Sequence, residues 1–151
     1  MKCLRAFVLC LFCVNFLSLA EAAPADFVGT WINVNPHSRG VVRFVVTPNM
    51  KMRLFGACTP SACDIGSAPL HTYGKSIEDT NHRQGTAHYT LDFKEIDAKL
   101  TLVNRQRMDL EHFNRFTDNS NRQNYLMKER FRKATHFEIM NMPLSPDDFE
   151  N

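Results

Sequence analysis

Apolar and polar residues alternate along the second half of the chain with a period of two. The period recurs in four segments, residues 86–93, 99–103, 108–115 and 125–132. In the first segment Tyr89, Leu91 and Phe93 share one face and polar residues occupy the other. Such alternation indicates antiparallel strands that are buried on one side and wetted on the other.

The first half of the chain holds shorter candidate strands, of which residues 41–47 are rich in β-branched residues. They are residues 30–34, 41–47 and 52–57, with a weaker candidate at residues 71–73. Asn35-Pro36 and Pro48-Asn49 provide turn chemistry after the first two. No stretch shows a convincing helical period. About eight strands at this spacing predict an all-β fold, either an antiparallel up-and-down barrel or, as the alternative, a β-sandwich.

Residues 1–22 have the features of a cleavable export signal. Basic residues near the start precede an apolar run over residues 6–19, and Ala20-Glu21-Ala22 has the small-x-small form of a cleavage site. The run is shorter than the roughly 20 residues that a membrane-spanning helix needs. No later stretch is apolar enough to span a membrane. We therefore expect a secreted protein with one domain over residues 23–133.

Removal of this signal would change the cysteine content. Cys3, Cys10 and Cys13 would leave with it, so that only Cys58 and Cys63 remain. A pair of cysteines in an oxidising compartment predicts one disulfide, here across a short turn-like loop. Metal binding is the rival interpretation, but no second cysteine pair and no spaced histidine pair accompanies the two thiols.

Two segments fall outside the alternating pattern. Residues 118–121, Asp-Asn-Ser-Asn, predict a hairpin turn, with Arg115 and Arg122 placed to pair with Asp118. Residues 134–151 follow the last strand and predict a loosely ordered C-terminal tail. The alternative for this tail is a peptide that docks the apolar residues of 137–144 on the domain or on a partner.

The remaining composition argues against several classes of function. The formal net charge of +2 does not favour binding to nucleic acid or another polyanion. No nucleophile elbow, zinc-protease helix, phosphate loop or Cys/His dyad is present, so we expect no enzyme activity, no catalytic residues and no cofactor. The six histidines are scattered. His88 and His112 could share a metal or a haem only if they lie on facing strands, and we expect no metal site.

The first strand begins with Phe27-Val28-Gly29-Thr30-Trp31, in which a glycine stands two places before a tryptophan. Together with the strand count and an arginine late in the last strand, this motif resembles the lipocalins and the wider calycin group. The resemblance implies a barrel in which Gly29 permits a tight start and Trp31 plugs one end. It also implies a cation–π contact between Trp31 and a late arginine, for which Arg132 is the candidate.

A barrel of eight strands is just wide enough for its own side chains or for one small ligand. We therefore expect a lipocalin-like barrel that binds a small, mostly apolar ligand. The expected lining residues are Val42, Phe44, Tyr89, Leu91, Phe93, Leu100, Leu102, Tyr125, Met127 and Phe131. The same residues would equally form a solid core. The alternative function is a structural or interaction protein of an extracellular matrix or secretion, acting through its surface and C-terminal tail.

Overall fold

The computed structural model describes residues 24–142 of the chain. The predicted export signal at residues 1–22 lies outside the described residues, as do residues 143–151 of the tail. Within the described part, no helix has the length and the apolar character needed to cross a membrane.

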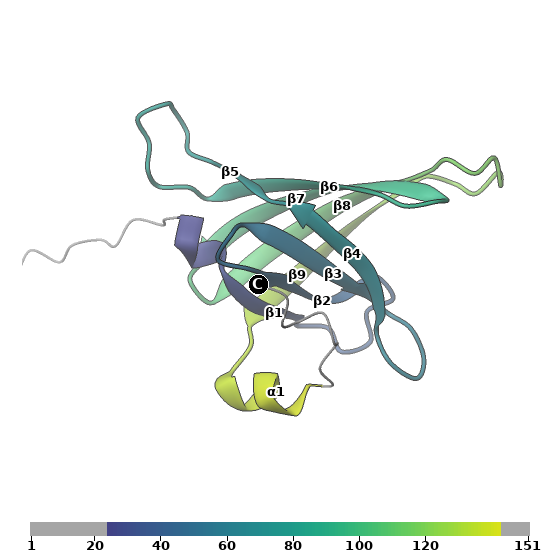
Figure 1. The fold of residues 1–151 in the computed structure, drawn as a ribbon, viewed down its shortest axis with the longest axis horizontal. Coiled ribbons are helices and arrows are strands. Elements are labelled where there is room, and N and C mark those ends of the chain that lie inside the picture. The colour runs from purple at the N-terminus through teal and green to yellow at the C-terminus, as the bar shows by residue number, and fades with distance from the viewer. Residues whose placement is uncertain (1–23, 143–151) are drawn as a thin grey trace, which may run out of the picture.

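Nine antiparallel strands form one sheet that is nearly closed as a barrel (Figure 1). The strands are β1 (Gly29–Asn33), β2 (Val41–Val46), β3 (Lys51–Gly56), β4 (Cys63–Pro69), β5 (His71–Tyr73), β6 (Gln84–Thr90), β7 (Lys94–Asn104), β8 (Arg107–Phe116) and β9 (Tyr125–Lys133). Their order in the sheet is β4-β3-β2-β1-β9-β8-β7-β6-β5. The predicted all-β up-and-down barrel is confirmed, with nine strands instead of about eight.

One bent segment brings the two edges of the sheet together. β4 pairs with β3, β5 pairs with β6, and Leu70 alone separates β4 from β5. Leu70 is buried, and its backbone N–H donates to the carbonyl of Met50 (2.7 Å). The sequence did not predict β4, because most of its residues are exposed and Gly66 and Pro69 interrupt any apolar alternation.

A short 3-10 helix, η1 (Pro24–Phe27), plugs one end of the barrel. Phe27 is fully buried, and its carbonyl accepts a hydrogen bond from Trp31 Nε1 (2.8 Å). Trp31 stacks on Phe44, whose ring meets that of Phe131 edge-on at 4.8 Å between centroids. Gly29 has a φ of +131°, a conformation that residues with side chains rarely adopt. This backbone conformation leads the chain from the plug into β1.

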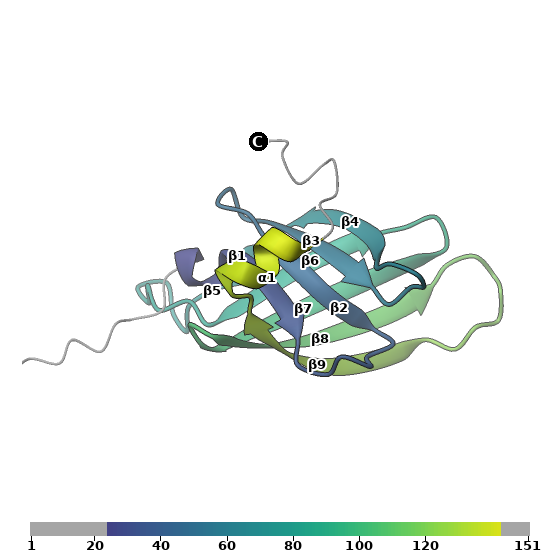
Figure 2. The same ribbon diagram turned by 90° about the horizontal axis from the view of Figure 1, so that it is seen from below.

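The two ends of the barrel differ in their loops. Loops 47–50, 74–83 and 105–106 lie with η1 at the plugged end, on the left of Figure 1. Loops 34–40, 57–62, 91–93 and 117–124 lie at the opposite end, which we call the loop end, and Figure 2 shows the same division from below. The predicted disulfide between Cys58 and Cys63 is confirmed within loop 57–62, with 5.5 Å between the Cα atoms.

Loop 117–124 joins β8 to β9 over eight residues and bends at residues 118–119, within the segment for which the sequence predicts a hairpin turn. Asn119 and Asn121 adopt left-handed φ values of 56° and 57°, which asparagine tolerates better than most residues. Arg122 pairs with Asp118, whereas Arg115 pairs with Glu95 on the neighbouring strand β7. The turn therefore uses one of the two arginines that the sequence suggested.

The chain continues after β9 into a short helix, α1 (His136–Asn141), where the sequence predicted a loosely ordered tail. Thr135 and Glu138 form a capping box, in which the Thr135 backbone N–H donates to the Glu138 carboxylate (2.9 Å). Arg132 of β9 also donates to Glu138 (2.8 Å), and these bonds lower the pKa of Glu138 to about 2. The cap and the ion pair together hold α1 beside the end of β9.

Candidate functional site

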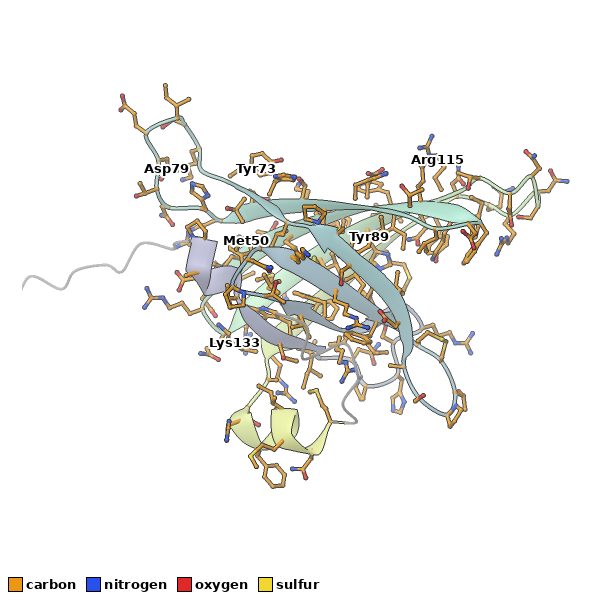
Figure 3. The ribbon with its side chains drawn as sticks, viewed as in Figure 1. Met50, Tyr73, Asp79, Tyr89, Arg115 and Lys133 are labelled. Carbon is orange, nitrogen blue, oxygen red and sulfur yellow. A yellow bond between two sulfur atoms is a disulfide. The ribbon has the colours of Figure 1, made fainter. Side chains whose placement is uncertain are left out.

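Several of the predicted lining residues form a closely packed core. Phe44, Tyr89, Leu100, Leu102 and Phe131 are each no more than 4 % exposed. Tyr89, labelled in Figure 3, extends from β6 and donates its hydroxyl to the Met52 carbonyl of β3 (2.7 Å). Because side chains this buried leave no room for a water molecule beside them, the plugged half of the barrel is filled by its own residues.

The other predicted lining residues lie near the loop end or outside the core. Leu91 packs against the core but is only partly buried, and Tyr125 and Met127 share the face of β9 that carries Phe131. Phe93 lies in the turn between β6 and β7 and is 41 % exposed. Val42 lies where the pairing of β2 with β3 shifts by one residue. Because of this shift it is only partly buried, whereas Val41, Phe44 and Val46 of the same strand are buried in the core.

The cation that covers Trp31 comes from Lys133, whereas the sequence suggested Arg132. Lys133 Nζ lies 5.2 Å from the centre of the indole ring (Lys133 is labelled in Figure 3). Phe131 points into the core, so Lys133 shares its face of β9 and Arg132 faces outward toward Glu138. The cation–π contact of the plugged end is thus present, but one residue further along β9.

A chain of polar side chains lies inside the barrel between the packed half and the loop end. β8 places His112 and Asn114 on its inward face, where they are 3 % and 2 % exposed. Lys94 Nζ donates to Asn114 Oδ1 (3.0 Å), and Asn114 Nδ2 lies 2.9 Å from His112 Nδ1. His112 Nε2 in turn lies 3.0 Å from Glu129 Oε2.

The direction of these hydrogen bonds follows from their ends. An ammonium group can only donate hydrogen bonds, so the Asn114 atom next to Lys94 Nζ must be the amide oxygen, which accepts. The amide nitrogen then donates to His112 Nδ1, which assigns the ring proton to Nε2, from where it is donated to Glu129. All donors in the chain therefore point from the Lys94 ammonium toward the Glu129 carboxylate.

Glu129 ties loop 34–40 to the inside of β9. Its carboxylate accepts hydrogen bonds from Ser38 Oγ, Asn33 Nδ2 (2.9 Å), Val41 N (2.9 Å) and His112. Burial alone would raise the pKa of Glu129, but hydrogen bonds from His112, Ser38 and the Val41 N–H outweigh it and hold the pKa below its ordinary value. With four donors around two oxygens, the carboxylate has little capacity left to accept a proton or to bind a ligand.

Aromatic rings and two cations gather beyond this chain, at the loop end. We call Phe93, Lys94, Phe116, Arg122 and Tyr125 the mouth cluster. The Arg122 guanidinium lies 4.1 Å from the centre of the Phe116 ring and 5.1 Å from that of Phe93. Lys94 Nζ lies 5.8 Å from the Phe93 ring, and the Phe116 and Tyr125 rings are 6.1 Å apart. Burial, and to a lesser degree the charge of Arg122, lower the pKa of Lys94.

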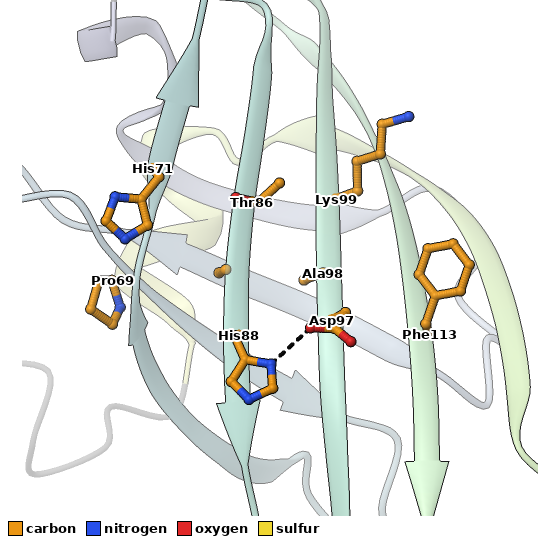
Figure 4. Close-up of a pocket in the computed structure, with 9 residues that line it drawn as sticks. Pro69, His71, Thr86, His88, Asp97, Ala98, Lys99 and Phe113 are labelled. Carbon is orange, nitrogen blue, oxygen red and sulfur yellow. Dashed lines mark hydrogen bonds and ion pairs between the residues drawn. The ribbon is translucent and has the colours of Figure 1, made fainter.

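The outer surface of the sheet carries a cavity of about 380 Å³ (Figure 4). It is lined by Pro69, His71, Thr86, Ala87, His88, Asp97, Ala98, Lys99 and Phe113. His88 Nδ1 lies 2.7 Å from Asp97 Oδ1, but both side chains are more than half exposed. A pair in that position contributes little, and no buried polar group points into the cavity from the residues that line it.

His88 and His112 do not form a joint metal site, because His88 is on the outer surface and His112 points into the barrel. Nowhere in residues 24–142 do three or more His, Cys, Asp or Glu side chains form a group that could hold a metal ion.

The sequence contained a partial signal for the polar chain. The alternation of residues 108–115 already placed His112 and Asn114 on one face with Met108 and Leu110. Polar residues at core positions of an alternating strand indicate either a site or a buried network. Lys94 carried no such signal, because it lies at the first position of β7, next to a turn.

No model of a known protein family matches the chain, and no curated protein matches it either.

Proposed function

We propose that the protein is a secreted, lipocalin-like barrel that binds a small, mostly apolar ligand at its loop end. The nearly closed barrel, the hydrogen bond from Trp31 to the η1 plug and the Cys58–Cys63 disulfide support this proposal. A disulfide is typical of proteins in oxidising, extracellular compartments.

One observation carries the location of the site. Inward side chains are fully buried at the plugged end, as with Trp31 and Phe131, and become partly exposed at Leu91, Lys94 and Met127 toward the loop end. Close packing therefore stops before the barrel does. Apolar walls beside a few polar groups are typical of small-molecule sites, and this description fits the inner surface at the loop end.

We propose a binding role and no catalysis. The inward carboxylate of Glu129 already accepts four hydrogen bonds, and the Nδ1 of His112 accepts one from Asn114. A general base needs a free lone pair directed at its substrate. Neither side chain offers one.

Two measurements test the proposed function. Native mass spectrometry of the secreted protein is expected to detect a co-purified small molecule. Titration with the neutral apolar fluorophore N-phenyl-1-naphthylamine is expected to give saturable binding that Met127→Trp or Leu91→Trp weakens, because the larger ring fills the loop end. Phe113→Trp, in the outer cavity, is the matched control and leaves binding unchanged. Loss of binding in Phe113→Trp alone would place the ligand on the outer surface and overturn the proposal.

A second candidate function is that of a structural or interaction protein that associates with other copies of itself through α1. Phe137 and Met140 are 77 % and 69 % exposed on this short helix, and exposed apolar residues that lie together usually mark contact sites. Sedimentation velocity would compare the wild type with Phe137→Ser/Met140→Ser. Reduced self-association in that double variant, but not in Phe113→Ser on the barrel wall, favours this function. Identical sedimentation of all three proteins counts against it.

A further inference from the structure

The mouth cluster holds two cations close enough to affect each other. Arg122 has a partner in Asp118, whereas no carboxylate among residues 24–142 lies within ion-pair distance of Lys94. The Lys94 ammonium has three N–H donors, and the described residues accept one of them, through Asn114 Oδ1. An ammonium group that lacks a carboxylate partner and has donors left over is stabilised when an anion approaches.

Lys94 is also held in a defined position. It pairs with Phe116 in the register of β7 and β8, so that both side chains lie on the inward side of the barrel. Asn114, which accepts from Lys94, is itself bonded to His112, and His112 to Glu129. This sequence of bonds orients the ammonium before any ligand arrives, which lowers the entropic cost of binding.

The surroundings of Lys94 favour a ligand with both a charged and an apolar part. Leu91, whose backbone N–H donates to the Lys94 carbonyl, and Met127 on the inward face of β9 supply partly buried apolar surface toward the loop end. Burial and the nearby Arg122 lower the pKa of Lys94, which is the response expected of a cation that lacks a counter-ion. An anion at this point would relieve the repulsion between the two cations.

We infer that Lys94 binds the anionic headgroup of an amphipathic ligand, whose apolar part lies along Leu91 and Met127. This inference rests on the proposed binding at the loop end and specifies the class of ligand. Asn114 acts as a positioning residue, because it orients the ammonium.

Decanoate and decanol, which share a chain length and differ in headgroup charge, are suitable probes. Isothermal titration at neutral pH is expected to show tighter binding of decanoate than of decanol to the wild type. Lys94→Gln is expected to weaken decanoate binding about tenfold or more, the effect of losing a charge-assisted hydrogen bond, and to leave decanol binding unchanged. Lys94→Arg keeps the charge and is expected to retain the preference for decanoate.

Lys99→Gln is the matched control, because Lys99 lies on the same strand but faces the outer cavity. It removes the same charge and is expected to change neither affinity. Circular dichroism verifies that each variant is folded. Equal affinities of the wild type for decanoate and decanol, or an equal loss in Lys94→Gln and Lys99→Gln, would overturn the inference while leaving the proposed function in place. Absence of binding by both probes and by the neutral fluorophore would overturn both.

Discussion

Glu129 is the residue on which four hydrogen bonds inside the barrel converge. It accepts from one side chain on β1, one on β8, one in loop 34–40 and one backbone N–H of β2. Glu129→Gln would replace one acceptor oxygen with an NH₂ group that faces these donors. We expect the free energy of unfolding to fall by about 2–4 kcal/mol, because buried donors lose their acceptor. Urea denaturation followed by circular dichroism measures the change.

Glu111→Gln provides the comparison at the residue scale. Glu111 lies 3.4 Å from Lys128 on the outer surface, and the lysine is 65 % exposed. Exposed pairs contribute up to about 1 kcal/mol, and often nothing measurable. If Glu129→Gln destabilises the protein no more than Glu111→Gln does, the interior carboxylate does not hold the network together.

Single residues show where sequence reasoning reached its limit. The period of two assigned His112 and Asn114 correctly to the face that carries Leu110, because alternation within a strand is local. It could not show that Glu129 of β9 lies within hydrogen-bond distance of His112, because that distance depends on the register between strands. The choice of Arg132 for the contact with Trp31 was wrong by one residue, and a shift of one residue reverses the face of the sheet.

At the scale of an element, loop 34–40 is held to the barrel by an ionised side chain. The pKa of Glu129 is lower in the folded protein than its ordinary value of 4.5. Its ionised form therefore contributes stability above that ordinary value, and the contribution is lost as the pH falls through the folded pKa. The groups that face Glu129 are His112 on β8, Tyr125 on β9 and, through Asn114, Lys94 on β7. We expect loop 34–40 to detach below about pH 4.5.

Hydrogen exchange detected by NMR tests this detachment. The Val41 N–H, which donates to Glu129, is expected to lose protection as the sample is acidified from pH 6 toward pH 3. Amides in the centres of β7 and β8 are expected to keep theirs over the same range. In Glu129→Gln, the Val41 amide is expected to be poorly protected at every pH. Equal loss across loop and strands would instead indicate global unfolding and contradict a local role for Glu129.

Two elements escaped prediction for different physical reasons. β4 has no alternating apolar face, because it lies at a sheet edge with most side chains exposed, and long-range pairing with β3 defines it. α1 is too short for a helical period to be recognised. Its capping box, Thr135 followed three residues later by Glu138, was visible in the sequence. The ion pair with Arg132 adds a tertiary contact that the sequence does not show.

At the scale of the whole molecule, strand spacing predicted the barrel but not how it closes. Short strands separated by Pro, Gly and Asn turns leave few architectures available to an all-β chain. Closure depends instead on a segment with weak sequence signals, residues 63–73, which passes from the edge at β3 to the edge at β6. The packing of the interior depends on closure as well, because the Tyr89 hydroxyl on β6 bonds to β3 across the same seam.

Leu70 lies at the centre of that seam, and its truncation tests whether closure stabilises the whole barrel. A Cβ placed on Gly85 of β6 would lie 3.1 Å from Leu70 Cδ1, so the leucine packs directly against this strand. Leu70→Ala is expected to lower the free energy of unfolding by about 2–5 kcal/mol, because it leaves a cavity that the two edges cannot fill.

Leu126→Ala is the control. It removes the same atoms from a side chain that is 44 % exposed on β9, and is expected to lower the free energy of unfolding by under about 0.5 kcal/mol. Urea unfolding followed by Trp31 fluorescence measures both. Because Trp31 lies in β1 and bonds to the η1 plug, away from the seam, a shifted midpoint in Leu70→Ala means that loosening the seam destabilises the plugged end as well. An unchanged midpoint would mean that residues 63–73 are dispensable for the stability of the rest.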